Sequence, residues 1–161
     1  MHVKFFVKKL IGRVGYFRGN YIMQPITSDQ IPAEFFNVKY NGKQIPGSDL
    51  SIYQSGSNCQ LFAYSLLSHF GFEVPPFRSS NLWEDEKFTE RVDSLQPLDV
   101  LLYHNKLSSW GAHVGLYLGN GQVVHLSVEN EYPVIQSHDS MNEIKKYQYF
   151  IGAKRLKNLK A

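Results

Sequence analysis

The chain contains a single cysteine, Cys59, in the segment GSNCQLF at residues 56–62. About fifty residues later, the run HVGLYLGNGQVVH places His113 and His125 at the two ends of an expected β-hairpin. A thiol nucleophile needs a base to take its proton, and a third group commonly orients that base. One cysteine followed by two histidines therefore predicts a nucleophile, a base and an orienting residue.

Cys59 lies where a helix is expected to begin. Ser57 or Asn58 can cap this helix, apolar residues recur along it, and Gly71 is placed to end it. A helix N-terminus carries unsatisfied amide donors and partial positive charge. We expect these groups to stabilise the Cys59 thiolate, so that it is alkylated well below pH 8, and to hold an oxyanion. The alternative interpretation is a buried core cysteine.

The register of the hairpin decides whether the two histidines share a site. An unbulged two-residue loop at 120–121 would place His113 and His125 on opposite faces of the sheet. An odd-length loop or a bulge there puts both on one face and pairs Leu116 with Val124, which leaves the other face apolar. We therefore predict such a loop or bulge, with both histidines on the side of the sheet that faces the thiol.

Two other interpretations of these residues stay open. Cys59, His113 and His125 could ligate zinc and leave one position open. No Asp or Glu lies at a spacing that would support such ligands, so we expect no metal and no cofactor. Two histidines on a half-buried sheet can also be polar residues with ordinary hydrogen-bond partners.

The bulk composition is that of a globular chain. It has 161 residues, 43% hydrophobic, 19% charged and 14% aromatic, which indicates one domain with a sizeable core. One cysteine excludes an internal disulfide and any zinc site built on several thiolates. The net charge of +3 is mild and the basic residues form no stripe, so we expect no nucleic-acid partner.

No apolar run approaches the ~20 residues of a membrane span. Within residues 1–24, lysines and arginines interrupt the apolar residues, so no signal peptide is recognisable. We therefore expect no membrane span, and either a cytoplasmic location or export by a non-standard route.

Periodicity predicts an α+β fold in which the helix with Cys59 packs on an antiparallel sheet. We expect a second, polar helix from about residue 79 toward residue 89, and strands at 99–104, 113–119, 122–125 and 147–156. Asn41-Gly42 is a candidate hairpin turn. The whole chain, 1–161, is taken as one domain with an N-terminal extension at 1–49.

The motifs of residues 50–130 resemble one known family. The run HVGLYLG with NG and VVH behind it is its strongest part, LQPLDV at 95–100 resembles the family's Leu-x-Pro-Gly-Asp-Leu, and Arg78-Ser79-Ser80 resembles its Arg-Thr-Ser. The chain is similar to the NlpC-type, papain-like cysteine peptidases of bacterial cell-wall metabolism. The resemblance implies that Cys59 is the nucleophile, His113 the base and His125 the orienting residue.

The same resemblance implies a substrate site and a reaction. Its candidate substrate-binding residues are Tyr53, Asn58, Gln60, Ser79 and Ser80. The implied function is hydrolysis of an amide through an acyl-enzyme, most readily a peptide bond in the stem peptides of peptidoglycan or its fragments. The alternatives are a thiol amidase or acyltransferase with another substrate, and a non-catalytic peptide-binding domain.

One departure concerns the substrate. The family usually has Asp-Cys-Ser-Gly around the nucleophile, whereas this chain has Asn58-Cys59-Gln60-Leu61. In the family, the acid before the cysteine helps to bind a free amine. We therefore expect the reaction type to be kept and the binding of the substrate amine to be altered.

Overall fold

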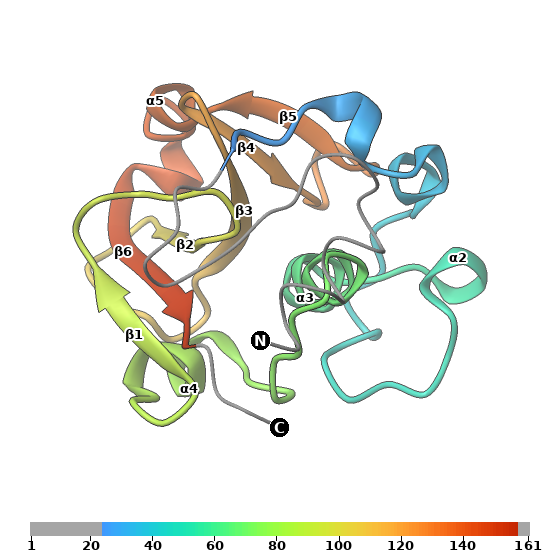
Figure 1. Ribbon diagram of the computed structural model, residues 1–161, viewed down its shortest axis with the longest axis horizontal. Coiled ribbons are helices and arrows are strands. Elements are labelled where there is room, and N and C mark those ends of the chain that lie inside the picture. Colours follow the sequence, from blue (N-terminus) through green and yellow to red (C-terminus); the bar gives the residue numbers. More distant parts are fainter. Residues whose placement is uncertain (1–23, 158–161) are drawn as a thin grey trace.

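The computed structural model describes residues 24–157, so the N-terminal segment discussed above lies largely outside the described residues. A six-stranded antiparallel sheet has the order β1-β6-β2-β3-β4-β5 and curves around one side of the molecule (Figure 1). Its strands are Thr89–Val92 (β1), Val100–His104 (β2), His113–Gly119 (β3), Gln122–His125 (β4), Val134–Ser137 (β5) and Tyr149–Leu156 (β6).

Helical segments surround this sheet. They are Ser28–Gln30 (η1), Ala33–Asn37 (η2), Ile52–Ser55 (α2), Cys59–His69 (α3), Ser79–Glu84 (α4), His138–Met141 (α5) and Lys145–Tyr147 (η3). The longest, α3, packs against β3 and β4. A helix that begins at Cys59 and lies on an antiparallel sheet is the predicted α+β arrangement. None of the helices in 24–157 has the length and apolar character that a membrane crossing requires.

The predicted limits of α3 are confirmed. The side-chain oxygen of Asn58 accepts a hydrogen bond from the backbone N–H of Leu61 at 2.8 Å, which caps the first turn. After the helix, Gly71 adopts φ +90° and its N–H reaches the carbonyl of Ser68, so a glycine ends the helix as expected. These local contacts fix the position of Cys59 as the first helical residue.

The β3–β4 hairpin has the predicted register in its bulged form. Leu116 pairs with Val124, but nearer the turn Gly119 pairs with Gln122, so the register shifts between Tyr117 and Gly119. The loop itself is the two-residue Asn120-Gly121, with positive φ at both positions. A bulge, rather than a longer loop, therefore brings the two histidines to one face.

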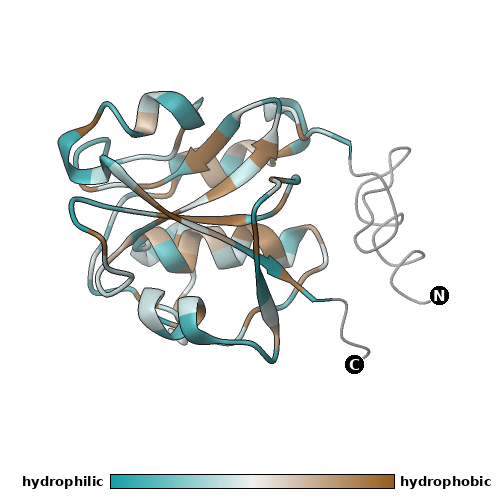
Figure 2. Cartoon of the chain, turned by 90° about the vertical axis from the view of Figure 1, so that its left-hand side faces the viewer, coloured by the Kyte–Doolittle hydropathy of each residue, from teal (hydrophilic) through white to brown (hydrophobic). Residues whose placement is uncertain are grey.

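The two faces of the sheet contact different layers. On one face, Val114, Leu116 and Val124 pack with Phe62 and Leu66 of α3 in the main core. On the other face, Leu101, Tyr103 and Val123 pack with Met141 and Tyr147 in a smaller cluster. Figure 2 shows hydrophobic colour along the strands and the inner helix, and hydrophilic colour in the outer loops. The sheet is thus buried on both sides around the hairpin.

Two expectations for local structure were wrong. The second helix, α4, stops at Glu84 instead of running toward residue 89, because the Asp85 carboxylate accepts the backbone N–H groups of Phe88 and Thr89 and forms a turn. Residues 41–42 form a turn but not a hairpin, since Tyr40 bridges to Ser57 instead. Strands β1 and β5 were not expected from the sequence.

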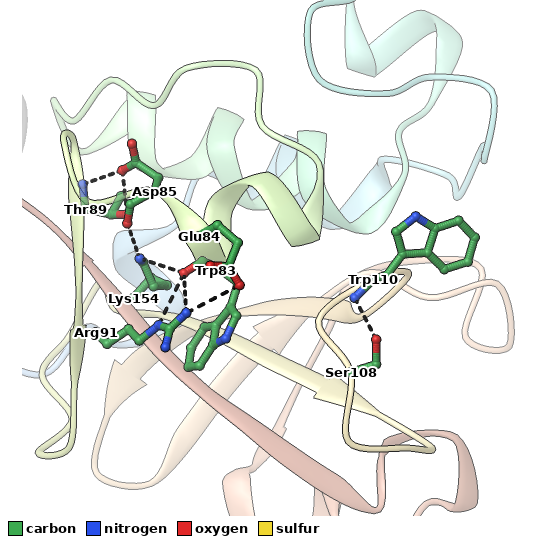
Figure 3. Close-up of polar contacts among 8 residues, drawn as sticks. All are labelled: Trp83, Glu84, Asp85, Thr89, Arg91, Ser108, Trp110 and Lys154. Atoms are coloured by element: carbon green, nitrogen blue, oxygen red, sulfur yellow. Dashed lines mark hydrogen bonds and ion pairs between the residues drawn. The ribbon is translucent and has the colours of Figure 1, made fainter.

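A buried lysine joins α4 to the sheet. Lys154 of β6 is only 1% exposed, and its ammonium donates to the backbone carbonyls of Trp83, at 3.1 Å, and Asp85 (Figure 3). These carbonyls belong to the C-terminal end of α4, where a cation is favourable. The guanidinium of Arg91 lies over the Trp83 ring, 4.1 Å from its centroid. These contacts explain how Lys154 can be buried, and they join α4 to β6 and β1.

Candidate active site

Cys59 is the first residue of α3, and its side chain interacts with the start of β3. The backbone amides of Val114, Cys59 and Gln60 act on its sulfur to lower the pKa of the thiol, which favours the thiolate. The Arg78 guanidinium adds a smaller effect of the same sign. Val114 directly follows His113, so the amide contact places the thiol beside the start of β3, where His113 lies.

His113 and His125 meet as the hairpin register predicts. His113 Nε2 and His125 Nδ1 are 2.9 Å apart, and the two rings meet edge to face with centroids 5.0 Å apart. His113 opens β3 and His125 ends β4, so the two side chains come from the open end of the hairpin. His125 is 1% exposed, so its ring nitrogens must find partners within the protein.

The other nitrogen of His125 contacts a residue of β5. His125 Nε2 lies 2.7 Å from Gln136 Oε1. The Gln136 amide donates from Nε2 to Ser140 Oγ at 2.9 Å, and Ser140 Oγ donates to the Ser137 carbonyl at 2.7 Å. A continuous series of hydrogen bonds therefore runs from His113 to the backbone between β5 and α5.

Tyr147 covers the face of His113. The two rings stack with centroids 4.3 Å apart and planes 19° apart. The Tyr147 hydroxyl hydrogen-bonds to Ser127 and Glu129, and the Glu129 carboxylate also pairs with Lys146. Beside these rings, an open pocket of about 220 Å³ is lined by Tyr103, His104, Asn105, Gly111, His113, Lys146 and Tyr147. His113 is therefore held on one face and reachable from this pocket.

The two histidines lie on the sheet face opposite to the one that α3 covers. The predicted bulge places both histidines on one face, and this is not the face under α3, which must be apolar and carries Val114 and Leu116. The thiol nevertheless lies near them because Cys59 is the first residue of its helix. Cys59 lies near enough to Tyr147, whose ring stacks on His113, that a thiolate there would raise the pKa of the Tyr147 hydroxyl.

The electrostatics of the site differ from the expected stabilised thiolate. Burial raises the pKa of the Cys59 thiol, and the amide groups and Arg78 offset this only in part. Burial, followed by the nearby His125, holds the pKa of His113 well below its usual range. Burial thus favours the uncharged form of both the thiol and the imidazole.

Comparison with protein families gives a match over residues 38–154 to the model described as NlpC/P60 family. The chain belongs to the NlpC/P60 family. The matched region is wider at both ends than residues 50–130, on which the resemblance of the motifs rests. A search of curated proteins gave no match.

Solved structures of NlpC/P60 proteins have a similar fold. A family member from Bacillus cereus matches with a TM-score of 0.57 and 21% identity, over 86% of this chain and 43% of that one. A lipoprotein-like NLP/P60 protein from Staphylococcus aureus matches with a TM-score of 0.54 and 12% identity, over 96% and 60%. The NlpC/p60 domain of the peptidoglycan hydrolase SagA gives 0.47 and 22%, over 71% and 92%. This chain thus spans under two thirds of the first and second proteins.

The residues expected to bind substrate in this NlpC/P60 chain differ in their exposure and contacts. Asn58 uses its side-chain oxygen to cap α3, and Gln60 is buried and accepts a hydrogen bond from Arg78 at 3.2 Å. Ser79 is also buried, at the start of α4, and Ser80 follows it half-buried. Tyr53 is exposed on α2, with its ring edge against Phe35. Asn58 and Gln60 adjoin Cys59 as its sequence neighbours.

Several residues of the site were not singled out from the sequence. Gln136 lies on a strand that was not expected, and Tyr147 lies at the start of the predicted last strand, so no motif marked either. For Arg78, the Arg-Ser-Ser motif was the available signal, although its serines rather than its arginine were chosen. Among residues 24–157, no group of three or more His, Cys, Asp or Glu side chains is arranged to hold a metal ion.

Proposed function

We propose that this protein is a cysteine hydrolase that cleaves an amide through an acyl-enzyme, and that its substrate is a peptide bond in peptidoglycan stem peptides. The observation that carries the reaction type is the 2.9 Å contact between His113 Nε2 and His125 Nδ1, together with a thiol at a helix N-terminus that interacts with the backbone of Val114, the residue after His113. A nucleophile, a base and an oriented partner of that base are the parts that acyl transfer requires.

In the first half of the reaction, His113 takes the proton of the Cys59 thiol as the sulfur attacks the carbonyl carbon. The backbone N–H groups around the first turn of α3 stabilise the resulting oxyanion. The imidazolium of His113 then gives its proton to the leaving nitrogen, the C–N bond breaks, and a thioester remains on Cys59.

In the second half, a water molecule replaces the amine. His113 takes one proton of the water, the hydroxide attacks the thioester carbonyl, and a second tetrahedral intermediate forms. Collapse of this intermediate breaks the C–S bond and releases a carboxylic acid. The proton on His113 returns to the sulfur, which restores the neutral pair that burial favours.

The choice of peptidoglycan rests on family membership and on the resemblance of the motifs to cell-wall peptidases. The test is digestion of purified muropeptides, with the products identified by mass spectrometry. We expect cleavage within stem peptides by the wild-type chain and none by Cys59→Ala, with unchanged circular dichroism. The absence of new fragments from the wild type would contradict the substrate, and equal cleavage by Cys59→Ala would contradict the mechanism.

A further inference from the structure

We infer that Gln136 is a positioning residue that sets the tautomer of both histidines and so leaves the free lone pair of His113 on Nδ1, available to take the thiol proton. This inference rests on the proposed function, because it concerns how the base is prepared. Gln136 does not adjoin Cys59 in the sequence or belong to any motif of the resemblance. It acts through His125, which it contacts at 2.7 Å.

The argument starts at a backbone carbonyl. The hydroxyl of Ser140 has one hydrogen, and it is donated to the carbonyl of Ser137 at 2.7 Å. Ser140 Oγ can therefore only accept from Gln136, 2.9 Å away, and this requires the NH₂ end of the Gln136 amide. The oxygen end of the same amide must then face His125. The direction of the amide is thus set, through the Ser140 hydroxyl, by the backbone carbonyl of Ser137, which can only accept.

The direction of the amide dictates the two imidazoles. Gln136 Oε1 accepts only, so the hydrogen of neutral His125 lies on Nε2. His125 Nδ1 is then an acceptor, and His113 Nε2, 2.9 Å away, must donate to it. The remaining nitrogen of neutral His113, Nδ1, carries the lone pair that can take the thiol proton. With the opposite tautomer, His113 would present an N–H group and could not act as a base.

The fold holds this series in place at both ends. Gln136 pairs with Val123 across β4 and β5, so its side chain emerges on the histidine face. Ser137 caps α5 by accepting the N–H of Ser140 at 3.0 Å, which places the Ser140 hydroxyl under the Gln136 amide. The first turn of the four-residue α5 therefore supplies Ser140, the residue that orients the Gln136 amide.

The test reads the tautomer directly. In protein labelled with ¹⁵N-histidine, long-range ¹H–¹⁵N spectra distinguish Nε2–H from Nδ1–H imidazoles in the free enzyme. We expect Nε2–H for His125 in the wild type, a mixture of tautomers in Gln136→Leu, and recovery in Gln136→Glu, which keeps an acceptor. Ser140→Ala, which leaves the amide free to flip, should show part of the change. Gln54→Leu, at an exposed position of α2, is the matched control.

Activity is measured on the same variants. We expect kcat/KM to fall about 10- to 100-fold in Gln136→Leu, as when the partner of an orienting histidine is lost at a metal site, and to recover in Gln136→Glu. An unchanged tautomer in a folded Gln136→Leu or Ser140→Ala protein would overturn the inference, as would a changed tautomer with unchanged kcat/KM. If the wild type cleaves no substrate, the proposed function fails, while the tautomer still shows whether Gln136 sets the histidines.

Discussion

The side-chain oxygen of Asn58 accepts the backbone N–H of Leu61 at 2.8 Å, so the residue before the candidate nucleophile is occupied as a helix cap. Asn58 is 7% exposed and its amide carries no charge, so the wild-type side chain offers a substrate amine only a neutral contact. The departure from the family's acid at this position is therefore compatible with the local fold, since Asn and Asp cap helices about equally well.

Replacement of Asn58 by alanine should destabilise the protein by about 0.5–2 kcal/mol, because the Leu61 N–H loses its partner where water has little access. The measurement is the free energy of unfolding from urea titration. Ser51→Ala is the matched control, because Ser51 caps only the four-residue α2 and does so with a longer bond of 3.3 Å. A similar loss of unfolding free energy in both variants would show that the Asn58 cap contributes no more to stability than the cap of the short α2.

Asn58→Asp should leave stability nearly unchanged and shift specificity toward substrates with a free N-terminal amine. A charge-assisted hydrogen bond is roughly twice as strong as a neutral one. The measurement is kcat/KM for one peptide with a free and with an acetylated N-terminus, in both proteins. If the wild type already prefers the free amine strongly and the variant does not differ, position 58 does not set this specificity.

The Cys59 thiol should be alkylated with a midpoint above that of an ordinary thiol, ~8.5, because burial raises its pKa. Rates of reaction with iodoacetamide across pH 5–10 measure this. The same chain in urea is the control, since there the pKa must return to its ordinary range. A native protein that reacts at pH 5–7 as fast as at pH 9 would instead contain a thiolate–imidazolium pair.

Stability should fall as the pH drops from 7.5 to 5.5. Burial lowers the pKa of His113 and His125 in the folded state, so below about 6.5 the unfolded chain binds more protons than the folded one, which favours unfolding. Carboxylates titrate below this window. Urea unfolding at the two pH values should give a smaller difference for His113→Gln than for the wild type, and an equal difference would contradict this assignment.

Gly152→Ala should destabilise the protein more than Gly121→Ala. A Cβ at Gly152, where φ is +149°, would lie 2.4 Å from the Trp83 ring, which Arg91 and Lys154 hold in place. At Gly121, with φ +72°, no heavy atom of the described chain would lie within 4 Å of the new Cβ, so only backbone strain of about 1–2 kcal/mol applies. The measurement is the thermal unfolding midpoint of each variant, which compares the steric overlap at Gly152 with the backbone strain at Gly121. An equal fall in the two midpoints would show that the Trp83 ring can move aside.

The histidine pair could be predicted because a hairpin is a local structure. Alternation of apolar and polar residues within thirteen positions, together with Asn120-Gly121, is enough to choose the register that unites His113 and His125. The start of α3 was predictable for the same reason, since Asn58 and Gly71 act within one turn of its ends.

The remainder of the site depends on contacts that no local pattern contains. Gln136 reaches His125 only because β5 pairs with β4, and Tyr147 reaches His113 only after the chain has passed through α5. The direction of the thiol pKa depends on how far Cys59 is buried, which the sequence does not show. Which elements cover each face of the sheet also depends on long-range packing. In this fold, α3 covers the face opposite to the one that carries the histidines.

The bulge at the β3–β4 turn constrains how this protein can change in length. Removal of one residue between Tyr117 and Gln122, or insertion of one, would rotate every following side chain of β4 to the other side of the sheet. His125 would then lie under α3, and the apolar Val124 would take its place beside His113. We therefore expect insertions and deletions at this turn to be tolerated in pairs, or singly only when the bulge is lost or gained at the same time.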